Sequence, residues 1–301
     1  MQMCNEVIEF EGIESYIDYT NLRLKILNYE ILSKELLLKV LVLARDKGLG
    51  KVLCNCRVRD LVFFRKMGFV VEGLISGFFR GRDAYCVSFF LNKDRVHSKR
   101  EEEEEEILKM CFDEKRISKP RKIDEQYKIR DCVEDDIPQM IKLFKKVFKT
   151  YPAPVFEEEY LREMINEKIL FKGVFSTNGL ISIASADLDS KNLNAEITDC
   201  ATYPKYRGRG LLSNLINELE EDLKARGYYI LYSLSRAINA GINISLRKQG
   251  YYYGGRLINN CNICGGFEDM NIWIKNLKPN VLSKPDKRKN TTVQQGRFVP
   301  H

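Results

Sequence analysis

The turn at residues 206–210, Tyr-Arg-Gly-Arg-Gly, restricts the fold of this chain more than any other feature. Residues 195–202 before it suit a strand, and apolar residues after it recur at the spacing of one helix face (Leu212, Leu215, Ile216, Leu219, Leu223). The first amides of such a helix lack partners within it and carry the positive end of its dipole. This order predicts a phosphate-binding turn, to which Arg207 and Arg209 add charge, although a Gly-x-Gly turn alone can be a mere tight connection.

Helix and strand patterns alternate through residues 126–277. Pro138 follows acidic residues, as at a helix start, and Asn178-Gly179 is a strong hairpin signal. The predicted strands are residues 127–130, 170–176, 180–186, 195–202, 229–235, 251–257 and 271–275, and the predicted helices begin near 137, 157, 210 and 240. The order β-α-α-β-β-β-α-β-α-β-β indicates an α/β (α+β) fold, with a mixed sheet covered by helices.

Composition indicates two globular units, because 301 residues with 44% hydrophobic content can form two modest cores. We expect domains at 1–98 and 126–277, separated by a charged linker at 99–125. That linker holds six consecutive glutamates, which resist packing into a core but could form a solvated helix. Residues 278–301 have the composition of a disordered basic tail.

Charge gives little support for a nucleic-acid partner. The net charge is +7, but residues 278–301 hold six Lys or Arg and one Asp, so +5 belongs to them and +2 to the rest. No apolar run reaches the roughly 20 residues of a membrane span, and the N-terminus lacks the pattern of a secretion signal. We therefore expect a cytoplasmic protein with no membrane partner.

The nine cysteines do not have the spacing of a disulfide framework. Cys261 and Cys264 have the spacing of half a zinc site, and Cys54 and Cys56 form another close pair. Only two histidines exist, and a Cys-x-Cys pair suits one metal poorly, so we expect buried thiols and no metal.

Residues 199–211 resemble the acetyl-CoA pyrophosphate loop of the GNAT superfamily, whose pattern is Gln/Arg-x-x-Gly-x-Gly/Ala, with Lys205 here in the first place. The resemblance implies a GNAT fold with acetyl-CoA as co-substrate. It also implies that the end of the strand splays to hold the pantetheine arm and that backbone amides of the turn bind the pyrophosphate. The residues concerned are Cys200, Ala201 and Thr202 on the strand, and Arg207, Gly208, Arg209, Gly210 and Leu211 on the turn.

Residues 239–251 resemble the second GNAT signature, an asparagine followed by a helix that ends in Leu-Tyr-x-Lys-x-Gly-Phe. Leu246 replaces the tyrosine that protonates the leaving thiolate in many members, so no acid role is assigned there. Asn239 is a candidate for contact with the CoA arm, and the alternative is that it only caps the helix.

Transfer to an amine requires a proton acceptor, because a primary amine with a pKa near ~10.4 is almost fully protonated at neutral pH. Residues 195–201 resemble the strand that carries the base of GNAT histone acetyltransferases, which makes Glu196 the candidate base and Asp199 the second choice. The alternative is that Glu196 faces solvent at an edge or pairs with a lysine.

Glu268 and Asp269, together with Glu196 and Asp199, would supply carboxylates for an acceptor with two amines. Residues 195–211, 235–243, 250–257, 260–263 and 270–273 resemble the bacterial and archaeal β-lysine N-acetyltransferases. This implies acetylation of the ε-amine of β-lysine, a small diamino acid, to give the compatible solute Nε-acetyl-β-lysine. In that family a lysine 2,3-aminomutase supplies the substrate.

The sequence is also compatible with other functions. A GNAT that acetylates another polyamine or a protein lysine, a noncatalytic acetyl-CoA-binding module, and RNA binding through the basic tail are the alternatives, and a homodimer is compatible with each. Residues 63–73 resemble the closing helix and strand of a GNAT fold, and residues 78–85 resemble the family's N-terminal region, yet residues 1–98 lack a convincing pyrophosphate loop. We expect them to form a degenerate, noncatalytic half-GNAT that packs on the active domain.

Overall fold

The computed structural model describes residues 5–114, 117, 120, 122–167 and 169–277. The N-terminal half comprises β1 (Glu6–Phe10), β2 (Ile13–Asp18), β3 (Arg23–Tyr29), α1 (Lys34–Asp46), β4 (Lys51–Cys56), α2 (Val58–Lys66), β5 (Val70–Phe79) and β6 (Arg82–Phe90). A short 3-10 helix, η1 (Lys93–Arg95), and helix α3 (Glu101–Asp113) lead away from it.

The C-terminal half contains β7 (Lys128–Asp131), η2 (Glu134–Asp136), α4 (Ile137–Val147), α5 (Glu158–Glu167), β8 (Ile169–Ser176), β9 (Gly179–Asp189), β10 (Asn194–Thr202), η3 (Pro204–Tyr206), α6 (Leu211–Ala225), β11 (Ile230–Arg236), α7 (Ala240–Lys248), β12 (Tyr252–Ile263) and β13 (Gly266–Asn276). The sequence predicted these helices and strands. The largest shift is in the last hairpin, where β12 and β13 extend to a turn at Cys264 and Gly265, both with positive φ.

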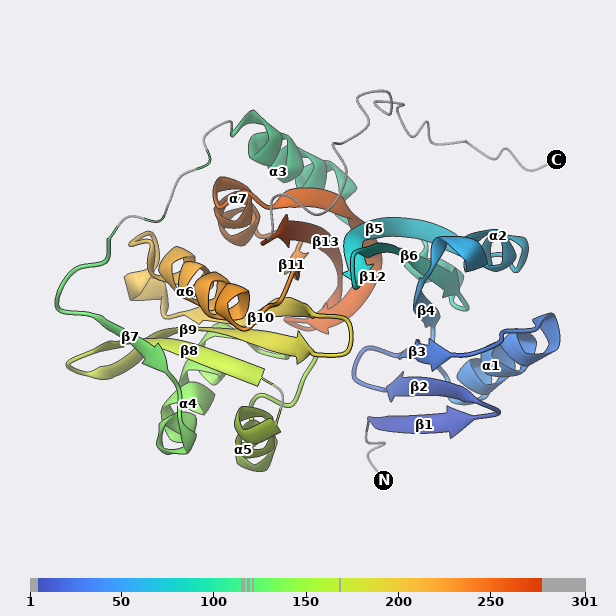
Figure 1. The fold of residues 1–301 in the computed structure, drawn as a ribbon, viewed down its shortest axis with the longest axis horizontal. Coiled ribbons are helices and arrows are strands. Elements are labelled where there is room, and N and C mark those ends of the chain that lie inside the picture. Colours follow the sequence, from blue (N-terminus) through green and yellow to red (C-terminus); the bar gives the residue numbers. More distant parts are fainter. Residues whose placement is uncertain (1–4, 115–116, 118–119, 121, 168, 278–301) are drawn as a thin grey trace.

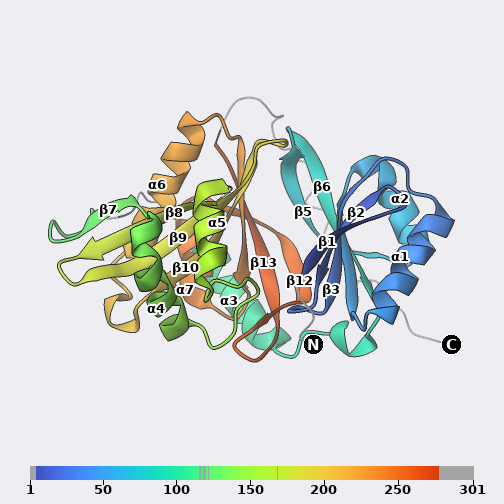
Figure 2. The ribbon, with the colours of Figure 1, turned by 90° about the horizontal axis from the view of Figure 1, so that it is seen from below.

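All the strands of the described residues form one 13-stranded mixed sheet, in the order β1-β2-β3-β4-β6-β5-β12-β13-β11-β10-β9-β8-β7. Figures 1 and 2 show the two halves of the sheet inclined to one another, with β5, β12 and β13 between them. Helices α1 and α2 lie on the outer side of the N-terminal strands, and α6 and α7 cover one face of the C-terminal strands (Figure 1).

The two halves have the same strand connectivity. In the first, β3 and β4 are parallel and lie beside β6 and then β5; in the second, β10 and β11 are parallel and lie beside β13 and then β12. Both halves also have a register shift in the hairpin that precedes the parallel pair, between Glu14 and Ser15 and between Thr198 and Ala201. The first half therefore repeats the β-β-β-α-β-α-β-β part of the second, without counterparts of β7, α4 and α5.

Glycines form the junction between the halves, where Gly73 of β5 pairs with Gly255 of β12. A Cβ atom on Gly255 would overlap Glu72 O and Gly73 Cα, so only glycine allows the strands to approach this closely. Beyond this crossing, the buried ion pair of Lys51 with Glu72 binds the backbone of Ile258: the ammonium donates to the carbonyl at 2.8 Å, and a carboxylate oxygen accepts from the amide at 2.7 Å.

Helix α3 corrects the expectation of a solvated connector. Glu104, Ile107, Leu108 and Cys111 are buried at the i, i+3, i+4, i+7 spacing of one helix face, and the last three belong to the core of the C-terminal half. Glu104 is only 3% exposed and lies beside Arg256, at 3.5 Å. Of the six consecutive glutamates, five are therefore exposed to water, and Glu104 is buried beside a positive charge.

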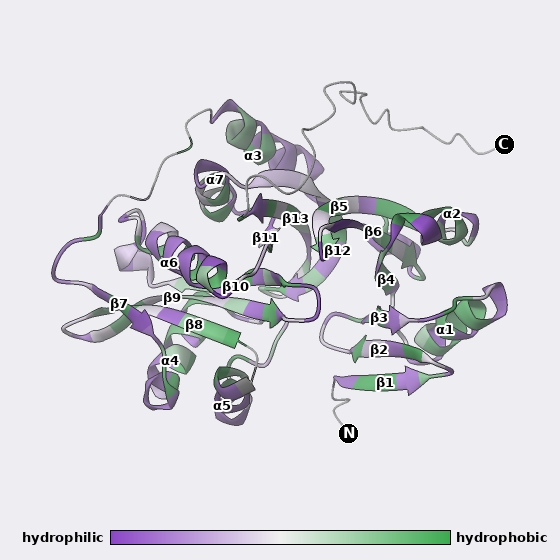
Figure 3. Cartoon of the chain, viewed as in Figure 1, coloured by the Kyte–Doolittle hydropathy of each residue, from purple (hydrophilic) through white to green (hydrophobic). Residues whose placement is uncertain are grey.

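Hydrophobic cores lie under each helical layer, and the colouring of α6 in Figure 3 follows its one-sided burial. Leu215, Ile216, Leu219 and Leu223 of α6 are completely buried against the sheet. No helix among the described residues is both long and apolar enough to cross a membrane. The predicted basic tail lies outside the described residues.

Candidate active site

Strands β10 and β11 separate near the middle of the C-terminal half. Their parallel pairing runs from Asn194 with Ile230 to Glu196 with Tyr232 and then stops, although both strands continue. A bulge in β10, with Asp199 at a φ of 47°, turns the strand away from its neighbour. The diverging strands leave backbone groups of β10 available for a ligand.

A cavity of about 590 Å³ occupies the space between these strands, α6, α7 and the end of α4. Several predicted cofactor residues line it, namely Cys200, Thr202, Arg207, Gly208, Gly210, Leu211 and Asn239. Its lining also includes Tyr151, Asp199, Leu234 and Met270. The cavity therefore combines the start of a helix with partly apolar walls and a carboxylate.

The turn before α6 has the geometry required for an anion. Gly208 and Gly210 have φ values of 78° and 74°, in the left-handed region, and no atom lies within 4 Å of where a Cβ of Gly208 would be. Gly210 is the N-cap of α6, and no side chain among the described residues caps this helix end. The first-turn amides can thus bind a diphosphate, which is the acidic centre of acetyl-CoA.

Three cations surround this turn and are exposed. The Arg207 guanidinium donates to the Thr202 carbonyl at 3.3 Å, and the Arg209 guanidinium donates to the Tyr127 hydroxyl at 2.9 Å. Lys205 lies over the Tyr206 ring, with 5.0 Å between its ammonium and the ring centroid. Lys205 and Arg209 do not line the cavity, so their effect on a bound diphosphate would be long-range attraction.

Two other predicted cofactor residues have structural contacts. Ala201 is buried against the core under α4 and α5 and lies outside the cavity. The Asn239 side chain accepts a hydrogen bond from the Gly241 amide at 3.1 Å, so it caps α7 while lining the cavity. Its contact with the CoA arm stays a prediction. Leu246, which stands in the place of the family tyrosine, is completely buried.

Glu196 does not line the cavity but lies next to a residue that does. Thr198, two residues along the same strand face, lines the cavity, and Tyr232, opposite Glu196 on β11, hydrogen-bonds the Glu196 carboxyl. Burial raises the pKa of Glu196 to about 7, against the lowering effect of Lys25. A carboxylate with this pKa can accept a proton near neutral pH.

Asp199, the second candidate base, is held by two hydroxyl groups. The Ser185 hydroxyl donates to its carboxylate at 2.7 Å, and Tyr151 forms a further hydrogen bond with it. Burial raises the pKa of Asp199, while these two bonds lower it. Asp199 lines the cavity directly, so both carboxylates stay candidates for the proton acceptor.

Glu268 and Asp269 are occupied by protein contacts. Glu268 accepts two hydrogen bonds from Arg236, both at 2.6 Å. Asp269 is 2% exposed, accepts from the Asn259 amide at 2.7 Å and also hydrogen-bonds Glu104. Neither lines the cavity, and their role in acceptor binding stays a prediction.

Several residues around Glu196 and Asp199 were not predicted from the sequence. Tyr151 follows α4 and reaches Asp199, and Tyr232 reaches Glu196. Asp187 pairs with Glu196 across the β9–β10 ladder, and it is a like charge that raises the pKa of Glu196. Strand alternation places Asp187 on the same face as Ser185, which was the available signal.

Diverging parallel strands that lead to an uncapped, glycine-rich helix start define the class of acyl-CoA-dependent acyltransferases. Residues 128–242 match the family described as Acetyltransferase (GNAT) domain. The chain is 33% identical to the N-acetyltransferase YodP of Bacillus subtilis over 90% of this chain and 98% of the relative.

Two archaeal proteins are also similar. One is a beta-lysine N(6)-acetyltransferase of Methanosarcina mazei, 36% identical over 78% of this chain and 94% of the relative. The other is a beta-lysine N(6)-acetyltransferase of Methanococcus maripaludis, 33% identical over 80% of this chain and 88% of the relative. The chain belongs to the GNAT acetyltransferase family and is an acetyl-CoA-dependent N-acetyltransferase that acts on an amine.

Proposed function

We propose that the acceptor is β-lysine and that its ε-amine receives the acetyl group, which gives Nε-acetyl-β-lysine. Carboxylates in and beside the cavity support this most directly: Asp199 lines it, and Glu196 and its cross-strand partner Asp187 lie outside the lining on the neighbouring part of the sheet. Two amines in one acceptor need such a negatively charged environment. The names of the two archaeal relatives point to the same acceptor.

Glu196 is the residue we propose as base. The attacking amine must be neutral, so a proton passes from the ammonium to the Glu196 carboxylate, directly or through water. The nitrogen then bonds to the acetyl carbon as the carbon–sulfur bond breaks, and the electron pair of that bond stays on sulfur. The proton that the nitrogen loses to become an amide passes to this thiolate, which leaves as the free thiol of CoA. Acetyl-CoA supplies the acetyl group, and the first-turn amides of α6 with Cys200 and Thr202 would hold it.

The substitution Glu196→Gln tests whether Glu196 is the base. It should lower kcat by about 100-fold or more, since positioned acid–base groups contribute roughly 10²–10⁴-fold. Acetyl-CoA affinity should stay similar, because Glu196 lies outside the cavity lining. In the wild type kcat should rise with pH through about 7, where the Glu196 carboxyl loses its proton, and the variant should lack this step. Asp199→Asn is the matched comparison: if it alone abolishes the pH step, Asp199 is the base.

Acceptor identity is tested by steady-state kinetics with β-lysine, α-lysine, spermidine and a lysine peptide. The proposal requires the highest kcat/KM with β-lysine, and mass spectrometry of the product should place the acetyl group on the ε-amine. Equal rates with all four acceptors would exclude the assignment. The product's role as a compatible solute and its supply by a lysine 2,3-aminomutase belong to the same proposal, and loss of that aminomutase should abolish product formation in cells.

A further inference from the structure

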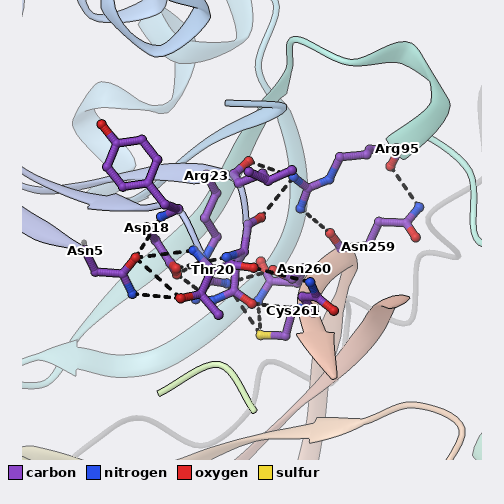
Figure 4. A network of polar contacts seen from close by, with 12 residues as sticks. Asn5, Asp18, Thr20, Arg23, Arg95, Asn259, Asn260 and Cys261 are labelled. Atoms are coloured by element: carbon purple, nitrogen blue, oxygen red, sulfur yellow. Dashed lines mark hydrogen bonds and ion pairs between the residues drawn. The ribbon is translucent and has the colours of Figure 1, made fainter. Parts of the chain in front are cut away.

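The N-terminal half is fixed against the active site through β12. The Arg23 guanidinium donates to the Asn260 carbonyl at 2.9 Å and to Cys261 Sγ at 3.5 Å, and Arg95 donates to the Asn259 carbonyl at 2.5 Å (Figure 4). Asn21 accepts from the Asn262 amide at 2.7 Å. These side chains replace a regular strand ladder in the bulged part of β12, so β3 has a defined position relative to the C-terminal half.

A second set of contacts joins the halves beside Glu196. The β5–β6 hairpin touches the β9–β10 hairpin, where Arg80 donates to the Lys191 carbonyl at 2.6 Å and Asn194 donates to the Phe78 carbonyl at 2.8 Å. The Phe78 ring lies 5.7 Å from the ring of Tyr232, the residue that hydrogen-bonds Glu196. Residues of both halves therefore lie near the proposed base.

Lys25 of β3 faces this region. Its neighbours Leu24 and Ile26 are buried in the core with α1, so alternation turns Lys25 to the opposite face, which it shares with Arg23. In Figure 2 that face of β2 and β3 is turned toward α5 and the C-terminal strands. The charge of Lys25 lowers the pKa of the Glu196 carboxyl, and Tyr16, its cross-strand partner, raises the pKa of Tyr160 on α5.

Lys25 is half-buried, yet within the described part of the chain it has neither an ion pair nor a hydrogen bond. Its neighbour on the same face, Arg23, is instead bound to Asp18 at 2.8 Å and to β12. The Glu196 carboxyl, whose pKa is about 7, balances the charge of Lys25 only in part near neutral pH, so Lys25 can bind a further anion brought by a ligand. The proposed acceptor carries one such group, its carboxylate, besides its two amines.

We propose that the N-terminal half completes the acceptor site and that Lys25 binds the carboxylate of the amino-acid acceptor, while the carboxylates of the C-terminal half bind its amines. The inference rests on the proposed function, since it requires an acceptor with both kinds of charge. The repeated half is then a specificity element, and acceptors without a carboxylate are disfavoured because Lys25 would stay unpaired.

The test compares β-lysine with 1,4-diaminopentane, which is β-lysine without its carboxylate. Lys25→Met should lower kcat/KM for β-lysine by about 10- to 100-fold, chiefly through KM, which is the range expected for a lost charged hydrogen bond. The value for 1,4-diaminopentane should change little or rise. Lys25→Arg keeps the charge and should keep most of the preference. Lys39→Met, on the exposed side of α1, is the control and should alter neither substrate.

Each outcome decides between the two proposals. Lys25 does not bind the acceptor carboxylate if Lys25→Met lowers kcat/KM equally for both substrates or for neither. The same conclusion follows if the wild type has equal kcat/KM for the diamine and the amino acid. If the wild type prefers α-lysine, the proposed acceptor is wrong, and the same comparison of α-lysine with 1,5-diaminopentane decides the role of Lys25.

Discussion

The two halves have the same strand order, but the N-terminal ends of their equivalent helices, α1 after β3 and α6 after β10, differ. Before α1, the Ser33 side chain accepts from the Leu36 amide at 3.1 Å, and Glu30 and Glu35 flank it. Before α6, no side chain among the described residues caps Gly210, and three cations surround the turn. We therefore expect the same strand–turn–helix order to repel a diphosphate in the N-terminal half and to attract it in the C-terminal half, because capping and charge are opposite.

The separation of the strands alone does not make a site. In the N-terminal half the parallel pairing of β3 with β4 also ends before β3 does, at Ile26. There, however, the Tyr29 hydroxyl bonds Asp60 of α2 at 3.0 Å, and its ring packs on Phe64. In the C-terminal half, Thr202 of β10 and Ser245 of α7 both line the open cavity. In the N-terminal half, large side chains therefore fill the space between β3 and α2. In the C-terminal half, the corresponding space between β10 and α7 is the open cavity.

The largest expected effect comes from giving the α6 turn the charge of the α1 turn. Gly208→Asp should weaken acetyl-CoA binding by about 100-fold or more, because a like charge against a phosphate costs several kcal/mol. Gly208→Asn tolerates the left-handed backbone without the charge and should lose much less. Ile31→Asp adds the same charge before α1, at a position 83% exposed, and should leave binding unchanged. Calorimetric titration measures all three; equal losses for Asp and Asn would show that shape, not charge, matters.

The next effect, on stability, is expected at the junction of the halves. Gly255→Ala should lower the free energy of unfolding by about 2–4 kcal/mol, because its Cβ would meet the backbone of Glu72 and Gly73. Gly12→Ala is the matched control: its φ is also positive, at 79°, but no atom lies within 4 Å of the added carbon. Chemical denaturation should show the difference. Similar losses in both variants would mean that the junction is not closely packed.

The smallest predicted effect concerns α3. Burial and Asp269 raise the pKa of Glu104 to about 7, so its contribution to stability is present at low pH and is lost as pH rises through about 7. Glu104→Gln should remove on the order of 1–2 kcal/mol of pH dependence between pH 5 and 8. Glu103→Gln, exposed on the same helix, should not. An unchanged pH dependence in Glu104→Gln would show that this carboxyl does not couple α3 to the sheet.

Local signals were sufficient for the C-terminal half. Glycine and proline positions, the Asn-Gly hairpin and the apolar spacing of α6 are short-range properties, so they predicted the elements and the turn before Gly210. The placement of Glu196 beside Tyr232 and Lys25 depends on pairing between strands far apart in the chain. Local sequence patterns therefore could not predict that Lys25 lies on the face of the sheet turned toward the proposed base.

Charge patterning misled the prediction for α3, since six glutamates in succession indicate a solvated segment. Burial of Glu104 needs Arg256 and Asp269, which lie more than 150 residues away along the chain and meet it only in the folded sheet. Likewise, Asp269 is a reasonable amine ligand in sequence, but its contacts with the Asn259 amide and Glu104 are long-range or bulge-specific.

The two halves should differ in acetyl-CoA binding, with a site in the C-terminal half alone. Isothermal titration of the full chain with acetyl-CoA measures this difference. One molecule should bind per chain, and Gly208→Asp should remove that binding event. Binding of two molecules per chain, or of one molecule with the same affinity in Gly208→Asp, would show that the C-terminal turn is not the acetyl-CoA site or not the only one.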